Sequence, residues 1–286
     1  MLALAAALAV LSAGIYAPAE VATPMPPVLG VELRYDPPLG EAARYRVTLK
    51  VEGEQVSLGE RLPVAWEAEA EVTEEVVARE SDGSFWLRTT ARLRDVTGGN
   101  GAFANGAPTA WPEVRLHLSQ RGEVLETARA DIAGALGVRE QALASLISES
   151  NPIILPNGPV QSGDEWQVEA GAARQSNRFL SLKGEGDSQV ARVASVATWP
   201  LTVDESVPEL GLETHLTGEA RQTSETELLV RTGLVRRQTG RTHLVTKSEA
   251  TLSLPDGSKV FPIQSDLTVT FDVRLISVDG RPIGSR

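Results

Sequence analysis

Apolar and polar positions alternate with a period of two through most of the chain from Tyr45 onward. Tyr45, Val47, Leu49 and Val51 would share one face of a strand. The longest run places apolar side chains on one face at Leu62, Val64, Trp66, Ala68, Ala70, Val72, Val76 and Ala78, and acids on the other at Glu67, Glu69, Glu71 and Glu75. The pattern predicts long antiparallel strands with one apolar face and one face turned to water.

A hairpin is predicted where this run ends. Ser81-Asp82-Gly83-Ser84 follows it, and a two-residue Asp-Gly loop favours a type I′ turn. The next strand has apolar residues at Phe85, Leu87, Ala91 and Leu93, which alternate with Arg88, Arg92 and Arg94. If Ser81 faces Ser84, Val72 faces Leu93 and Glu71 faces Arg94. We therefore expect apolar pairs on one face and a ladder of acid–base pairs on the other.

Further strands are predicted along the rest of the chain. They lie around 114–118, 124–125, 166–170, 178–183, 189–199, 212–220, 226–237, 241–254 and 259–278. Turns are expected at 121–122, 184–186, 232–233, 255–257 and 279–280, where glycine recurs. The Gly-rich stretch 97–108 lacks the Gly-Lys-Ser/Thr ending of a phosphate-binding loop. It predicts a flexible loop at a sheet edge, with Phe103 as the residue that would close over a cavity.

One segment has a different period. Ile132, Leu136, Leu143 and Leu146 within 128–150 have helical spacing, and Asn151-Pro152 would end the helix. The expected fold class is therefore mainly β, of the α+β type. A long, curved antiparallel meander would pack around one amphipathic helix on its concave side.

The N-terminal segment is typical of an export signal. Residues 1–19 carry no charge, and Ala17-Pro18-Ala19 offers small residues at a cleavage site, so we expect a signal peptide over 1–19. No Lys or Arg precedes Arg34, so either translation begins upstream or the signal is weak; an uncleaved membrane anchor is the rival interpretation. An extended Pro-rich leader would follow over 20–33. Residues 34–286 would form a single β-rich domain, with 34–150 and 151–286 as two related halves in the alternative view.

Composition narrows the function. The formal net charge is −11, with acids spread along the chain, so we expect no nucleic-acid partner. The chain has no cysteine, which removes disulfides, thiolate nucleophiles, Cys-ligated metals and a lipid-attachment cysteine. With a cleaved signal, the mature protein would be periplasmic or secreted, without a stable membrane anchor.

The segment after the predicted helix resembles a known family. Pro159-Val160-Gln161-Ser162-Gly163-Asp164-Glu165-Trp166 follows a proline-rich crossover that starts at Leu155. This Pro-Val-x-x-Gly-Asp-x-Trp segment, in a β-meander, resembles an uncharacterised family of exported bacterial proteins that is defined only as a domain of unknown function. The resemblance implies a curved sheet partly wrapped around a helix, broadly like periplasmic lipoprotein carriers, and no known activity. From the residues themselves, Asp164 is expected to form a turn and Trp166 to anchor the core.

No residue pattern indicates a catalytic, cofactor-binding or metal site. His117, His215 and His243 lie in different predicted strands, so we interpret them as solvent-facing. The serines form neither a Gly-x-Ser-x-Gly elbow nor a Ser-x-x-Lys motif. The acids of the Glu67 strand would pair with the arginines of the next strand instead of binding a cation.

Three functional hypotheses follow. The first is a non-enzymatic envelope protein with a structural or protein-binding role. The second is a carrier that binds a lipid or another apolar ligand in the concave face of the sheet. The third is an enzyme whose site assembles from scattered residues.

Overall fold

The computed structural model describes residues 30–98, 113–129, 153–207, 212–254 and 257–282. Within these residues the regular structure is β-strand, with one short 3-10 turn at Gly186–Ser188. The strands are β1 (Ala42–Ser57), β2 (Glu60–Arg79), β3 (Phe85–Gly98), β4 (Val114–Leu118), β5 (Val124–Arg129), β6 (Glu165–Ala170), β7 (Ala173–Lys183), β8 (Val190–Val207), β9 (Leu212–Leu229), β10 (Val235–Leu254), β11 (Gly257–Val278) and β12 (Arg281–Pro282).

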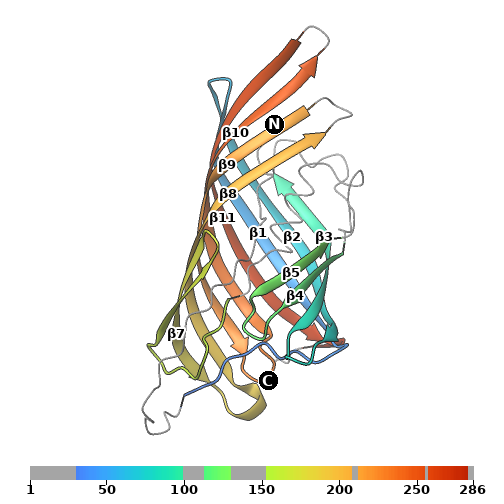
Figure 1. Ribbon diagram of the computed structural model, residues 1–286, viewed down its shortest axis with the longest axis vertical. Helices are drawn as coiled ribbons and strands as arrows, with labels where there is room; N and C mark the ends of the chain where they lie inside the picture. The colour runs from blue at the N-terminus through green and yellow to red at the C-terminus, as the bar shows by residue number, and fades with distance from the viewer. Residues whose placement is uncertain (1–29, 99–112, 130–152, 208–211, 255–256, 283–286) are drawn as a thin grey trace.

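All of these strands belong to one antiparallel sheet. Its order is β5-β4-β3-β2-β1-β11-β10-β9-β8-β7-β6, with β12 paired to β11. The two meanders of the chain, β1 to β5 and β6 to β11, therefore meet at the β1–β11 pair in the middle of the sheet. The sheet curves into a trough, and the β10–β11 hairpin extends furthest at one end (Figure 1).

The predicted alternation determines which side of the sheet buries its side chains. In β1, residues Ala43, Tyr45, Val47, Leu49 and Val51 are buried, whereas the residues between them are exposed. The same side of β2 buries Trp66, Ala68, Ala70 and Val72. These side chains form one core cluster with inward residues of β8 to β11, and we call this side the concave face.

The hairpin between β2 and β3 forms, but its predicted register is wrong by two residues. Val72 pairs with Ala91 and Glu71 with Arg92. Glu80 and Ser84 close a three-residue loop that contains Gly83 at φ 88°, and a bulge between Val76 and Ala78 shifts the register again. A three-residue loop with a left-handed glycine is the next most common hairpin connection. Because the total error is two residues, each side chain keeps its predicted face.

The α+β class and its helix are wrong. The described residues contain no α-helix, and Ala128 and Arg129, where the helix was expected to start, end strand β5. The remainder of the predicted helix, 130–150, lies outside the described residues. Apolar spacing alone did not distinguish the end of a strand from the start of a helix at this point.

One end of the trough is covered by extended chain. Residues 31–37 and 153–160 form a bridge between Val31 and Val160 and pack with the ends of several strands in a second core cluster. Leu155 is fully buried there, and its N–H donates to the Arg121 carbonyl over 2.8 Å. Proline suits such a segment because it favours extended chain.

The residues expected to form a turn and to anchor the core after this crossover do so. The Asp164 carboxylate accepts a hydrogen bond from the Gln161 N–H over 2.7 Å, and Gly163 has a φ of 98°. The half-buried Trp166 packs against the second core cluster and donates its indole N–H to the Ile154 carbonyl over 2.8 Å. Both predicted structural roles are confirmed.

Most predicted strands are present, with one exception. The strand expected over 226–237 is two strands, because β9 ends at Leu229 and β10 begins at Val235. The turn predicted at 232–233 lies between them, with Gly233 at φ 69°. In the described part of the chain, no helix is long and apolar enough to cross a membrane.

Candidate functional site

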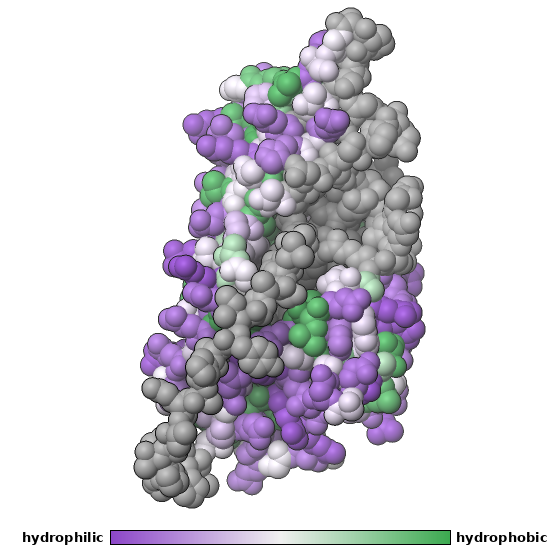
Figure 2. Space-filling model, in the orientation of Figure 1, coloured by the Kyte–Doolittle hydropathy of each residue, from purple (hydrophilic) through white to green (hydrophobic). Residues whose placement is uncertain are grey.

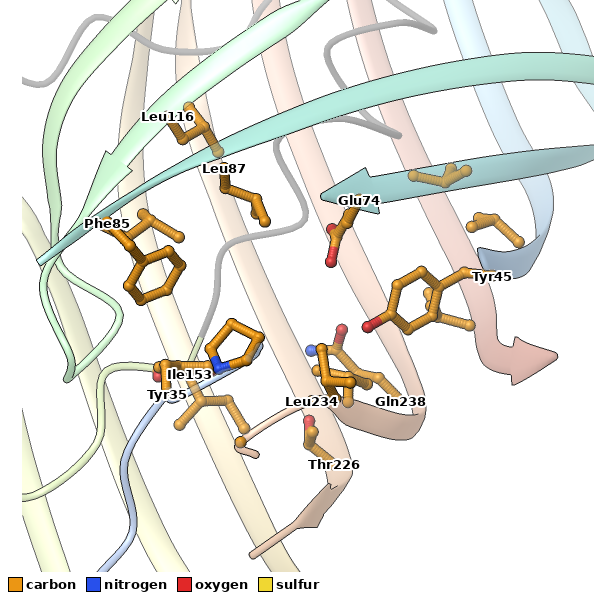
Figure 3. Close-up of a pocket in the computed structure, with 17 residues that line it drawn as sticks. Tyr35, Tyr45, Glu74, Phe85, Leu87, Leu116, Ile153, Thr226, Leu234 and Gln238 are labelled. Atoms are coloured by element: carbon orange, nitrogen blue, oxygen red, sulfur yellow. Dashed lines mark hydrogen bonds between the residues drawn. The ribbon is translucent and has the colours of Figure 1, made fainter. Parts of the chain in front are cut away.

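A cavity of about 90 Å³ lies at the covered end of the trough, between the concave face and the 31–37 and 153–160 segments. Its walls are mostly aliphatic and include Val47, Val72, Leu87 and Val273. Five polar side chains also line it: Tyr35, Tyr45, Glu74, Thr226 and Gln238. Figure 3 shows Glu74, Tyr45 and Gln238 turned toward the same space from different strands. We call this cavity the Glu74 pocket.

Glu74 faces inward because of its place in the β2 alternation. It follows Trp66, Ala68, Ala70 and Val72 at even positions, and Val76 comes next on the same face. Its neighbours across the strands are Ala43 on β1 and Thr89 on β3. Since both of these side chains are small, they leave room for the carboxyl to reach into the pocket, beside the Tyr45 phenol.

The environment of Glu74 disfavours its charge. Burial raises the pKa of the Glu74 carboxyl to about 7, and the hydrogen-bonding influence of the Tyr45 phenol only partly opposes this. Burial, together with the nearby Glu74 charge, raises the pKa of both Tyr45 and Tyr35. The described residues that line the pocket include no Arg, Lys or His. Glu74 is therefore a half-buried acid that the described pocket walls do not neutralise.

The concave face also carries buried polar atoms that have no hydrogen-bond partner among the protein's described atoms. They are Gln55 Nε2, Thr89 Oγ1, Ser224 Oγ, Thr226 Oγ1 and Ser265 Oγ. The strand pairing places all five on the concave face; for example, Thr89 lies beside Glu74, and Gln55 lies beside Ser265. Leaving such a group unsatisfied costs about 1–3 kcal/mol, so five on one face call for polar partners there.

The two faces of the sheet differ sharply in charge. The outer, convex side carries ion pairs between neighbouring strands, such as Arg237–Asp272 at 3.1 Å and Arg46–Glu69 at 3.4 Å. Figure 2 shows mainly hydrophilic residues over the coloured surface. The concave side of β7 to β10 instead carries neutral polar residues, namely Gln175, Asn177, Ser195, Gln222, Ser224, Thr226, Gln238 and Thr242. Together with the aliphatic side of β1, β2 and β11, they form a concave face that is amphipathic and nearly free of charge.

The histidines do not form a catalytic arrangement. His117 is half-buried instead of solvent-facing; it stacks on Trp86 with ring centroids 4.8 Å apart, and its Nε2 lies 2.9 Å from Ser84 Oγ. Ser84 also donates to Asp82 over 2.7 Å, so the serine lies between acid and histidine. In a catalytic triad the histidine holds the middle position.

The other two histidines are exposed, as expected. His243 lies 2.7 Å from Asp266 on the convex face, and His215 is exposed on β9. Over the described residues, no group of three or more His, Asp or Glu side chains is placed to hold a metal ion.

The acids opposite the concave face form ion pairs, as predicted, but with two strands instead of one. Arg94 contacts Glu71 and Arg88 contacts Glu75, whereas Lys50 of β1 lies 3.9 Å from Glu67. Arg94 contacts Glu71 diagonally, because the residue directly opposite Glu71 is Arg92 and not Arg94 as predicted. The ladder is therefore a structural feature of the exposed surface.

Sequence reasoning missed the central residue of the pocket. Glu74 stands on the apolar face of the strand read from Leu62 to Ala78, and an acid at such a position was the available signal. Tyr45 lies on the predicted face, but the sequence pattern gives no sign of its position beside Glu74. The loop 97–108 and its Phe103 lie mainly outside the described residues, apart from Thr97 and Gly98 at the end of β3.

Comparison with known proteins gives little beyond this. No protein-family model and no curated protein matches the sequence. Among solved structures, a lipovitellin studied for lipid–protein interactions aligns with a TM-score of 0.39 and 12% identity, over 87% of this chain and 26% of the lipovitellin chain. The attachment invasion locus protein Ail of Yersinia pestis gives a TM-score of 0.14 at 6% identity, over 82% of this chain and 99% of that one. An outer membrane channel of Pseudomonas putida F1 gives 0.18 at 11% identity, over 88% and 100%. The chain thus spans about a quarter of the lipovitellin chain.

Proposed function

We propose that the protein is a non-enzymatic binding protein that holds an apolar or amphipathic small molecule against the concave face of its sheet. The observation that carries this is the division of the sheet into a charged convex face and a concave face that is aliphatic and neutral-polar. A face of this kind offers dispersion contacts together with uncharged hydrogen-bonding groups, which is typical of sites for small apolar ligands.

The buried polar atoms support a ligand that is not purely hydrocarbon. Thr226 Oγ1 is fully buried, lines the Glu74 pocket and has no partner among the described protein atoms. Ser224 Oγ, on the same face of β9, and Thr89 Oγ1, beside Glu74 on β3, are also buried without a partner among the described protein atoms. A ligand with a polar group would satisfy such atoms, whereas a packed apolar core would leave them at a cost.

The size of the pocket indicates what it would hold. A cavity of about 90 Å³ has room for several water-sized groups. It is therefore large enough for a head group but not for a whole lipid. The aliphatic wall of Val47, Val72 and Val273 continues into the first core cluster along β1 and β11, in the direction that an apolar tail would follow.

Dye binding to the folded protein tests this function. The neutral probe N-phenylnaphthylamine should bind saturably, with enhanced fluorescence and an unchanged far-ultraviolet circular dichroism spectrum. Val273→Phe, which fills the pocket from β11, should weaken binding. Thr270→Phe, at an exposed position of the same strand, should not. No saturable uptake by the folded chain, or equal uptake by both variants, would contradict the proposal.

The protein-binding role remains a second candidate, favoured by one observation. Strand β5 lies at an end of the sheet, and its Val124 and Leu125 are 42% and 46% exposed. An unpaired strand edge can accept a strand from another protein. Analytical ultracentrifugation of the full chain with Leu125→Lys as the comparison would detect self-association through this edge.

A further inference from the structure

Among the described residues of its pocket, the Glu74 carboxyl has no countercharge, and this constrains the ligand. A buried carboxylate needs a cation or several hydrogen-bond donors to offset the water that it has lost. The charged side chains nearest in sequence on β2 point to the other face, where Glu71 and Glu75 are paired with arginines of β3. The described pocket lining contributes no base. A cationic ligand would supply the countercharge that the described lining lacks.

The other polar groups of the pocket suit a cation with several N–H donors. Thr226 Oγ1 accepts hydrogen bonds and has no described protein partner, and the buried Gln238 lies directly opposite Thr226 in the β9–β10 pairing. An ammonium group has three donors and no acceptor. A carboxylate, a hydroxyl and an amide oxygen would together accept all three of them. In Figure 3 these groups surround one space.

The geometry points to a primary-amine head group as the ligand moiety held in the Glu74 pocket, with an apolar tail against the aliphatic wall of the concave face. This inference rests on the proposed function, and it adds the chemical class of the ligand. The ion pair would form between the ligand ammonium and the Glu74 carboxylate, with no proton transferred when both groups are already charged. A neutral apolar ligand would leave the carboxyl unpaired.

The titratable groups that face Glu74 are few. Tyr45 on β1 and Tyr35 on the 31–37 segment are the phenols near it. The facing positions on β3, β9, β10 and β11 are Thr89, Thr226, Gln238 and Val273, none of which carries a charge. Of the described groups that face the pocket, Glu74 is therefore the one whose ionisation would govern recognition of the ammonium across the neutral pH range.

Calorimetric titration with matched ligands tests the inference. At pH 8 the full chain should bind dodecylamine at least about tenfold more tightly than dodecanol, because breaking a desolvated ion pair is costly. Glu74→Gln should reduce this preference to about twofold or less, since it removes the charge and keeps the shape. Glu69→Gln, on the exposed convex side of the same strand, should keep the full preference.

A pH comparison on the unmodified chain gives an independent readout. The Glu74 carboxyl, with its pKa raised to about 7, is mainly protonated at pH 5, whereas an alkyl ammonium stays charged at both pH values. The amine preference should therefore be lost at pH 5, with dodecanol binding unchanged.

The outcomes separate the two proposals. Equal affinity for amine and alcohol at pH 8, or a preference that survives Glu74→Gln, would overturn the amine inference and leave the binding function standing. Failure of both ligands to bind the folded chain, together with failure of the neutral dye, would overturn the function as well.

Discussion

The stability of the protein should depend on pH through Glu74, and the dependence should vanish when Glu74 is replaced. An acid whose pKa is raised on folding, here from its ordinary value of 4.5 to about 7, is protonated in the native state at pH values where the unfolded chain has already ionised. The native state therefore loses stability as pH rises from about 4.5 to about 7, and the loss is complete above that range.

The size of this effect follows from the pKa. Raising a carboxyl pKa from 4.5 to about 7 corresponds to about 3 kcal/mol of native-state destabilisation above pH 7. Glu74→Gln removes the charge, but it also weakens the interaction with the Tyr45 phenol. The weaker interaction lowers the stability of the variant by about 1 kcal/mol. We therefore expect the variant to be more stable than the parent by about 2 kcal/mol at pH 8. At pH 4.5 and below, this gain should be absent.

Urea unfolding followed by tryptophan fluorescence at pH 4.5 and pH 8 measures this. Other acids, such as Glu71 and Asp272 beside arginines, have lowered pKa values and stabilise the fold as pH rises, so only the difference between variant and parent is informative. Glu69→Gln serves as the control and should change the free energy of unfolding by less than about 1 kcal/mol. An equal Glu74→Gln difference at both pH values would refute the link between stability and the ionisation of Glu74.

The remaining predictions concern the covered end and the convex face. Leu155→Ala should lower the free energy of unfolding by about 2–5 kcal/mol in urea titration, because Leu155 is fully buried. A loss below about 1 kcal/mol would show that the crossover segment contributes little to the stability of the core. Gly233→Ala should lower the free energy of unfolding by about 2 kcal/mol or more, because Gly233 has a φ of 69° and a Cβ would lie 2.3 Å from a backbone oxygen. As the control, Gly158→Ala should change the free energy of unfolding little in the same assay, because a Cβ there would have nothing within 4 Å. Arg94→Ala should cost only about 0.2–1 kcal/mol, and thermal unfolding should show this difference shrinking in high salt, because its pair with Glu71 is partly exposed; a salt-independent loss would argue against a surface pair.

The sequence allowed the strands and their faces to be predicted because both depend on local patterns. Period-two alternation located β1 and β2 and assigned their faces, and glycine marked the turns near 184, 233 and 280. The register of the β2–β3 pair was harder to predict from the sequence. The bulge between Val76 and Ala78 and the three-residue loop that ends at Gly83 each displace the pairing by one residue, and neither has a distinctive local signature.

The site was hidden for a different reason. The pocket brings together β2, β9, β10 and two extended segments. The two segments are more than 100 residues apart in sequence, yet the Tyr35 hydroxyl of one donates to the Ile153 carbonyl of the other over 3.1 Å. The sheet order that pairs β1 with β11 could not be deduced from turns between consecutive strands. Glu74 alone offered a local signal, as an acid at an apolar position of the alternation. Export, signal cleavage and the resemblance around Pro159 to Trp166 stay predictions.

The most direct test of the binding function is native mass spectrometry of the full chain, purified under non-denaturing conditions from its own source cells. We expect a population with added mass from a bound small molecule, which is released on denaturation and identified as apolar or amphipathic. The Val273→Phe variant should carry less of it than Thr270→Phe. A ligand-free mass for the folded chain, with no uptake when an apolar amine or alcohol is added, would contradict the account.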